Sequence, residues 1–133
     1  FGIAYRDFDV DGREFVLPTT TPVHFAPEAL CHSVDRLMSY QPKAIYLTHY
    51  AEVRDLARLA RQMKERVRAF ADLGRRYADA PDRAIKLRKG MYAMLCGWLD
   101  EHGFARDDAK RHYLLDDDVE LNSQGIENWL DRK

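Results

Sequence analysis

The sequence predicts an α/β fold that continues into an all-helical extension, and three observations support this class. First, residues 43–50 (KAIYLTHY) contain a short apolar, β-prone run, which is typical of a buried strand. Second, helical patterns precede and follow this run, which is the order of elements in an α/β layer. Third, the patterns after residue 77 are helical.

The first part of the chain predicts a short β-hairpin. Residues 1–6 alternate loosely, residues 14–17 are β-prone, and residues 9–12 (DVDG) are a turn signal in which Gly12 can adopt a positive φ. Residues 18–22 (PTTTP) then predict a rigid, hydroxyl-rich loop, because each proline fixes its own φ and restricts the preceding residue. We interpret this loop either as a connector or as a wall that lines a substrate site.

Apolar residues at helical spacing predict four helices, at 27–40, 52–77, 82–102 and 122–132. Pro27 suits the first position of a helix, Pro81 breaks the second pattern, and Gly103 supplies a C-terminal stop for the third. We expect the apolar stripes of the two longest helices to bury each other as an antiparallel helical hairpin.

Composition excludes several function classes. Residues 54–89 carry twelve Lys and Arg against five Asp and Glu, and the chain from residue 100 onward is acidic. We expect these faces to be solvated and to settle against each other, because the basic residues lack the interleaved aromatic residues that a single-strand nucleic-acid binder needs. No window approaches the roughly 18 apolar residues of a membrane span. We therefore expect neither a nucleic-acid nor a membrane partner.

The two cysteines, Cys31 and Cys96, lack CxxC spacing, which favours a reducing cytoplasmic location. The chain contains no GxSxG, GxGxxG or P-loop motif, so serine catalysis and phosphate binding have no local signal. The aspartate run 116–118 lacks the spacing of a calcium loop, and we interpret it as a solvated or helix N-terminal cluster.

Among the five histidines, His49 is the strongest candidate for a ligand or a catalytic group. The end of a strand holds a side chain rigidly, and the neighbours of His49 carry hydroxyl groups. From the residues alone, a packing or capping role stays open, because a zinc site takes about three or four protein ligands and every other ligand would come from outside the chain. His24 follows the threonine loop and could reach a pocket. The others, expected at the surface or in caps, are His32, His102 and His112.

Three stretches together resemble the metallo-β-lactamase-fold hydrolases, in particular the glyoxalase-II-like members with a helical C-terminus. They are FGIAYR at 1–6, FVLPTTTPVHFAPEAL at 15–30 leading into YLTHY at 46–50, and DVELNSQGIENWLDR at 118–132. The first is similar to the residues that follow a Gly-Asp-Thr turn in this family. The resemblance covers nearly the whole chain and implies the C-terminal half of an αβ/βα sandwich at 1–77, followed by a helical extension at 78–133.

The resemblance also implies a site and an activity. His49 matches the family's last histidine ligand, which binds the second of two divalent metal ions, such as zinc. The other ligands belong upstream: the HxHxDH motif, a further histidine, and a metal-bridging aspartate just before Phe1. The chain would therefore be a fragment whose first partner is the N-terminal half of the same fold. Alone, it is expected to be inactive, with no catalytic residue and with an absent or incomplete metal site.

In the complete protein, metal-bound hydroxide would attack the carbonyl of a thioester or ester substrate. We expect Tyr50, Thr20 and Thr21 to line the pocket and donate to an oxyanion, and His24 to reach the substrate. For these residues, packing and turn formation is the alternative.

A second hypothesis is a non-catalytic helical interaction or dimerisation module, in which the helical hairpin packs on a partner helix or on its own copy. We also expect the chain to form a homo-oligomer, because half of a sheet leaves apolar faces and an open strand edge. The helical extension would cap the substrate entrance or make a dimer contact.

Overall fold

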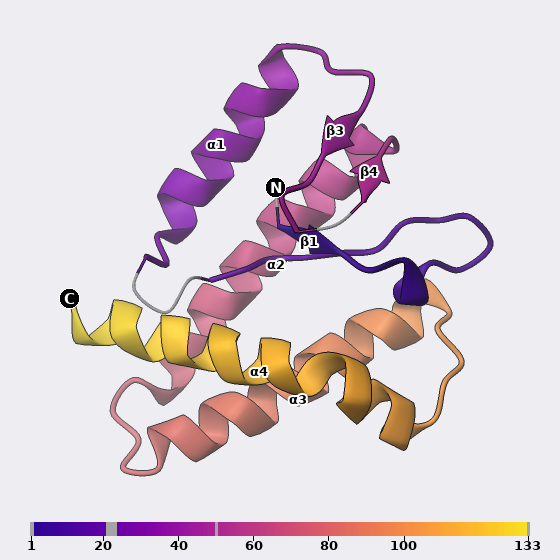
Figure 1. Cartoon of the computed structure of the whole chain (residues 1–133). Helices are drawn as coiled ribbons and strands as arrows, with labels where there is room; N and C mark the ends of the chain where they lie inside the picture. The colour runs from indigo at the N-terminus through magenta and orange to yellow at the C-terminus, as the bar shows by residue number, and fades with distance from the viewer. Residues whose placement is uncertain (1, 21–23, 50, 133) are drawn as a thin grey trace. The chain divides into compact units, whose positions relative to one another are not determined.

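The computed structural model describes residues 2–20, 24–49 and 51–132, and in these residues it has four α-helices and two small antiparallel sheets (Figure 1). In chain order the elements are β1 (Ile3–Ala4), the 3-10 helix η1 (Arg6–Phe8), β2 (Val16–Leu17), α1 (Pro27–Ser39), β3 (Ile45–Tyr46), β4 (Glu52–Val53), α2 (Leu56–Tyr77), α3 (Arg83–His102) and α4 (Asp108–Asp131). The class is therefore mixed α and β, and helices dominate. Two compact units divide the chain: unit 1 is Phe1–Thr19 with Ala26–Ala69, and unit 2 is Thr20–Phe25 with Phe70–Lys133.

The predicted N-terminal hairpin is confirmed in unit 1. Strand β1 pairs antiparallel with β2, in the register Ile3 with Leu17 and Ala4 with Val16. Val10 and Arg13 exchange both of their backbone hydrogen bonds, at 3.2 and 2.9 Å. Between them Asp11 has a φ of 51° and Gly12 a φ of 73°. Two successive positive φ values are those of a type I′ turn, which matches the twist of paired strands.

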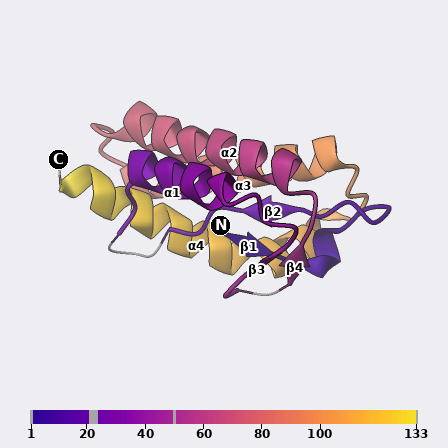
Figure 2. The same cartoon turned by 90° about the horizontal axis from the view of Figure 1, so that it is seen from above.

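The core of unit 1 contains one buried cation. Arg66 of α2 is 6% exposed, and its guanidinium lies 4.3 Å from the centre of the Phe15 ring and donates to the carbonyl of Val16. The hydrogen bond and the ring compensate the cost of removing this charge from water. Helix α1 lies beside α2 (Figure 2), and Lys64 of α2 pairs with Asp35 of α1. The sheet, α1 and α2 are thus held by polar as well as apolar contacts.

The strand predicted at 43–50 forms in part, as β3, but its predicted burial is wrong. Among the described residues of this stretch, Ile45 and Tyr46 form β3; Ile45 is half-buried and Tyr46 is 76% exposed. The physical reason is a chain reversal that sequence patterns did not reveal. Ala51 has a φ of 63° and its carbonyl accepts from the N–H of Leu47 at 3.0 Å. Strand β3 consequently pairs with β4, in the register Ile45 with Val53 and Tyr46 with Glu52.

Most of the helix predictions are confirmed, and two boundaries differ. Helix α1 and helix α3 lie where they were predicted, and Gly103 ends α3 with a φ of 88°. Helix α2 begins at Leu56 instead of residue 52, because Glu52 and Val53 form strand β4. Helix α4 begins at Asp108 instead of residue 122. The carboxylate of Asp107 caps it by accepting from the N–H of Lys110 at 2.9 Å.

The expected antiparallel helical hairpin is confirmed within unit 2. The Phe70 ring at the end of α2 stacks on the Trp98 ring of α3 with centres 5.9 Å apart, while Gly90 near the start of α3 lies against Leu73. Helix α4 adds a third layer, because Gly74 of α2 faces the side chains of Ile126 and Trp129. Unit 2 therefore buries its apolar stripes within its own three helices.

Candidate functional site

His49 lies on the surface of unit 1, next to the N-terminal hairpin. Its backbone forms a parallel bridge with Ile3, and its side chain is exposed. Strand β1 is therefore bonded to β2 on one side and to the His49 segment on the other. The ring does not enter the apolar interior. It remains accessible at a point where the backbone is fixed by strand pairing.

Glu14 fixes the start of α2, directly after the β3–β4 hairpin. Its two carboxylate oxygens accept from the N–H groups of Arg54 and Asp55, at 2.9 and 3.2 Å. Arg58, one turn into the helix, donates to the carbonyl of Glu14 at 3.0 Å. These bonds satisfy N–H groups that a helix start otherwise leaves without partners. They also tie the segment just before β2 to the segment that follows β4.

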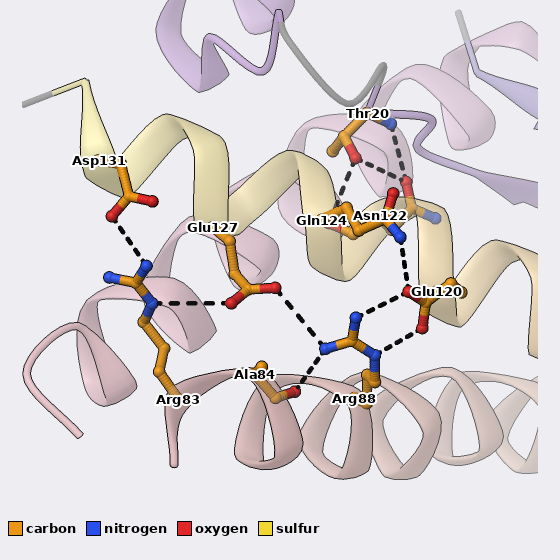
Figure 3. A network of polar contacts seen from close by, with 9 residues as sticks. All are labelled: Thr20, Arg83, Ala84, Arg88, Glu120, Asn122, Gln124, Glu127 and Asp131. Atoms are coloured by element: carbon orange, nitrogen blue, oxygen red, sulfur yellow. Dashed lines mark hydrogen bonds and ion pairs between the residues drawn. The ribbon is translucent and has the colours of Figure 1, made fainter. Parts of the chain in front are cut away.

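Of the four predicted pocket residues, the structure describes Thr20 and His24. Thr20 belongs to unit 2 and is 5% exposed; its N–H and its hydroxyl both donate to the side-chain oxygen of Asn122, at 2.8 and 3.1 Å (Figure 3). His24 also belongs to unit 2 and is exposed. Thr21 and Tyr50 lie outside the described residues. A substrate-lining role for these four residues stays a prediction.

The part of the chain that the structure describes contains no group of three or more His, Cys, Asp or Glu side chains able to hold a metal ion. His49 offers at most one coordination position, and zinc sites take about three or four protein ligands. The described residues therefore do not fit a complete metal centre.

A network of ion pairs joins α3 to α4 in unit 2 (Figure 3). Arg88 donates to both carboxylate oxygens of Glu120, at 2.5 and 2.7 Å, and lies 3.6 Å from Glu127. Arg83 approaches Glu127 at 3.9 Å and Asp131 at 2.8 Å. The hydrogen bond from Arg88 lowers the pKa of Glu120 to about 2. The expectation that basic and acidic helix faces settle against each other is confirmed here.

Sequence reasoning missed a second cluster on these helices. The rings of Tyr92 and His112 stack with centres 4.1 Å apart and planes at 9°. The Tyr92 hydroxyl donates to Asp108 at 2.5 Å, and Nδ1 of His112 lies 2.8 Å from Asp116. The hydrogen bond with Asp116 raises the pKa of His112. The sequence carries a signal for this cluster, because Asp108, His112 and Asp116 follow each other at i,i+4 spacing, which places them on one helix face.

Both cysteines are free thiols; Cys31 is buried and Cys96 is half-buried. None of the helices in the described ranges combines the length and the apolar character needed to cross a bilayer. Comparisons with protein-family models, curated proteins and solved structures find no match to this chain.

Proposed function

We propose that the chain is the C-terminal part of a metal-dependent hydrolase of the metallo-β-lactamase fold, which attacks a thioester or ester carbonyl, and that His49 supplies one metal ligand. The parallel bridge between Ile3 and His49 gives the main support. Residues 1–6 resemble the segment that follows the turn carrying the metal-bridging aspartate. Paired strands lie about 4.8 Å apart. The bridge thus brings the backbone of His49 beside the N-terminal segment. The second ligand, the metal-bridging aspartate, is expected just before this segment.

The exposure of His49 also supports this proposal. A ligand must present an unencumbered ring nitrogen, and an imidazole on the surface of unit 1 is open to ligands from the proposed N-terminal half. The remaining ligands, the second half of the αβ/βα sandwich and a divalent metal such as zinc would come with the N-terminal half of the same fold. When bound, such metals lower the pKa of water and polarise the carbonyl under attack.

The strands of unit 1 are consistent with an unfinished sheet. Each of the four described strands has only two residues, whereas strands usually have about 5 or 6. Further strands from an N-terminal half would lengthen or cover the open edges. In this proposal, residues 1–77 belong to the sandwich domain and residues 78–133 to its helical extension.

The direct test replaces His49 with Ala in the complete polypeptide and measures thioester hydrolysis. The matched control is His32→Ala, because His32 is an exposed histidine on α1 of the same unit. We expect His49→Ala to lower the rate by about 100-fold or more through loss of a ligand, and His32→Ala to retain it. Equal rates in both variants would refute the assignment of His49.

A second candidate function is a helical interaction or dimerisation module. It is supported by large apolar side chains that stay exposed on α3 and α4: Ile85 at 58%, Tyr113 at 81% and Leu121 at 48%. The chain would then associate with its own copy through these helices. Light scattering should show a mass that rises with concentration in the parent chain and less so after Leu121→Glu. A concentration-independent monomer would refute this candidate.

A further inference from the structure

A pocket of about 300 Å³ lies between α3 and α4 in unit 2. Its lining includes none of the residues assigned to the hydrolase proposal, and its volume is at the lower end of those of small-molecule sites. The lining residues come from both helices: Arg88, Lys89, Tyr92, His112, Asp116 and Val119.

The walls of this pocket suit a flat, apolar group. The rings of Tyr92 and His112 stack face to face, with centres 4.1 Å apart and planes at 9°, so they contribute two layers of aromatic carbon to the wall. Val119 contributes a buried aliphatic side chain, and Arg88 and Lys89 contribute the methylene groups of their stems. A planar ring placed in this pocket would contact aromatic and aliphatic carbon, which favours aromatic over hydrophilic ligands.

Two of the pocket's basic side chains already have carboxylate partners. Arg88 is held by Glu120 through two hydrogen bonds, at 2.5 and 2.7 Å. His112 lies 2.8 Å from Asp116 and 3.6 Å from Asp108. Neither side chain therefore presents an unpaired positive charge to a ligand.

Lys89 is the third basic side chain of the pocket and differs from the other two. It is exposed and makes no ion pair or hydrogen bond with another residue in the described ranges. The Asp82 carboxylate is paired with Lys86 at 2.8 Å. This pair, and to a smaller extent the charge of Lys89, lowers the pKa of Asp82. Lys89 is thus the basic side chain of the pocket that has no carboxylate partner among the described residues. A second negative charge on the ligand would meet the Asp116 carboxylate, which also lines the pocket.

We propose that this pocket binds a small monoanionic ligand with a flat apolar body, such as an aromatic carboxylate. The ring lies against Tyr92, His112 and Val119, and the carboxylate faces the ammonium group of Lys89. The proposal is independent of the hydrolase assignment, because the residues that carry it all belong to α3 and α4.

The test titrates the isotopically labelled full chain with 2-naphthoate and follows the backbone and ring resonances by NMR. Two probes of the same shape serve as charge controls: neutral 2-naphthamide and cationic 2-naphthylmethylammonium. We expect 2-naphthoate to shift the resonances of the lining residues of α3 and α4 and to bind more tightly than either control.

Lys89→Gln removes the proposed charge from an exposed position and should leave the fold intact. Its matched control is Lys86→Gln. Lys86 lies about one turn earlier on α3 and pairs with Asp82. We expect Lys89→Gln to weaken 2-naphthoate binding by about 2- to 5-fold, the range of an exposed charge pair, and Lys86→Gln to leave it unchanged. Three results would overturn the proposal: no shifts at the lining residues at millimolar probe, equal binding of the three probes, or equal effects of the two lysine variants.

Discussion

Thr20 and Asn122 are 102 residues apart in the sequence, and hydrogen bonds join them directly. The N–H of Thr20 donates to Oδ1 of Asn122 at 2.8 Å, and its hydroxyl donates to the same oxygen at 3.1 Å. Both residues are buried, at 5% and 2% exposure. One amide side chain on α4 therefore satisfies two donors of the threonine loop, and it anchors the segment that leads toward α1.

Asn122→Ala should destabilise the chain. The substitution removes the acceptor and leaves the buried N–H of Thr20 without its side-chain partner, which costs about 1–3 kcal/mol. Urea unfolding followed by circular dichroism measures the loss. The control is Asn128→Ala, on the same helix at a half-buried position, with an expected change below about 0.5 kcal/mol. Equal losses in the two variants would show that the contact with Thr20 contributes nothing specific.

Two helical glycines should respond in opposite directions to alanine. A Cβ at Gly74 would lie 2.6 Å from Cγ2 of Ile126 and 3.3 Å from the ring of Trp129, whereas a Cβ at Gly97 would meet nothing within 4 Å. Gly97→Ala should therefore stabilise by up to about 1 kcal/mol through helix propensity. Gly74→Ala should destabilise by about 1–3 kcal/mol through overpacking. Thermal unfolding of both variants checks this; a stabilised Gly74→Ala would refute the close packing of α2 on α4.

The Arg88–Glu120 pair should make stability depend on acidic pH. The pKa of Glu120 falls from 4.5 to about 2 in the folded chain, mainly through its hydrogen bond with Arg88. A lowered folded-state pKa stabilises the ionised form, so the contribution is complete above about pH 4.5 and is lost as the pH falls toward 2. Glu120 is 44% exposed, so solvent screening limits the gain to about 1 kcal/mol or less.

Glu120→Gln should accordingly be less stable than the parent chain at pH 7 and equally stable near pH 2. Urea unfolding across this range measures the difference. Glu101→Gln is a suitable control because Glu101 is exposed at the end of α3. A constant difference between parent and Glu120→Gln across the range would contradict the linkage.

His112 should contribute a pH dependence of opposite sign. The hydrogen bond with Asp116, and then the charges of Asp116 and Asp108, raise its pKa above 6.5. Its contribution is therefore complete below pH 6.5 and is lost as the pH rises through the folded-state pKa. NMR titration of the imidazole should give a midpoint above 6.5. Asp116→Asn should return the midpoint toward 6.5. An unchanged midpoint would show that Asp116 does not stabilise the protonated imidazole.

Local sequence patterns predicted the elements that depend on local chemistry. The DVDG turn gave the hairpin because Gly12 adopts a positive φ at no steric cost, and Gly103 ended α3 for the same reason. The apolar stripes of α2 and α3 predicted their antiparallel contact. These features depend only on residues that are close in the sequence or that share one face of a helix.

The misses arose from features that local patterns do not encode. The burial expected for residues 43–50 failed because Ala51 takes a positive φ, which only a few per cent of non-glycine residues do, and the chain turns back into β4. The start of α4 at Asp108 was not predicted, because the first turns of the helix are mostly polar. The side chain of Asp107 caps this end of the helix. The bridge of His49 to Ile3 joins distant segments, and no local pattern predicts it.

His49 is the proposed metal ligand, and its substitution should change the metal content of the complete polypeptide. We expect about two zinc equivalents by plasma mass spectrometry in the parent protein and in His32→Ala, and about one fewer in His49→Ala. The same metal content in all three proteins would contradict the claim.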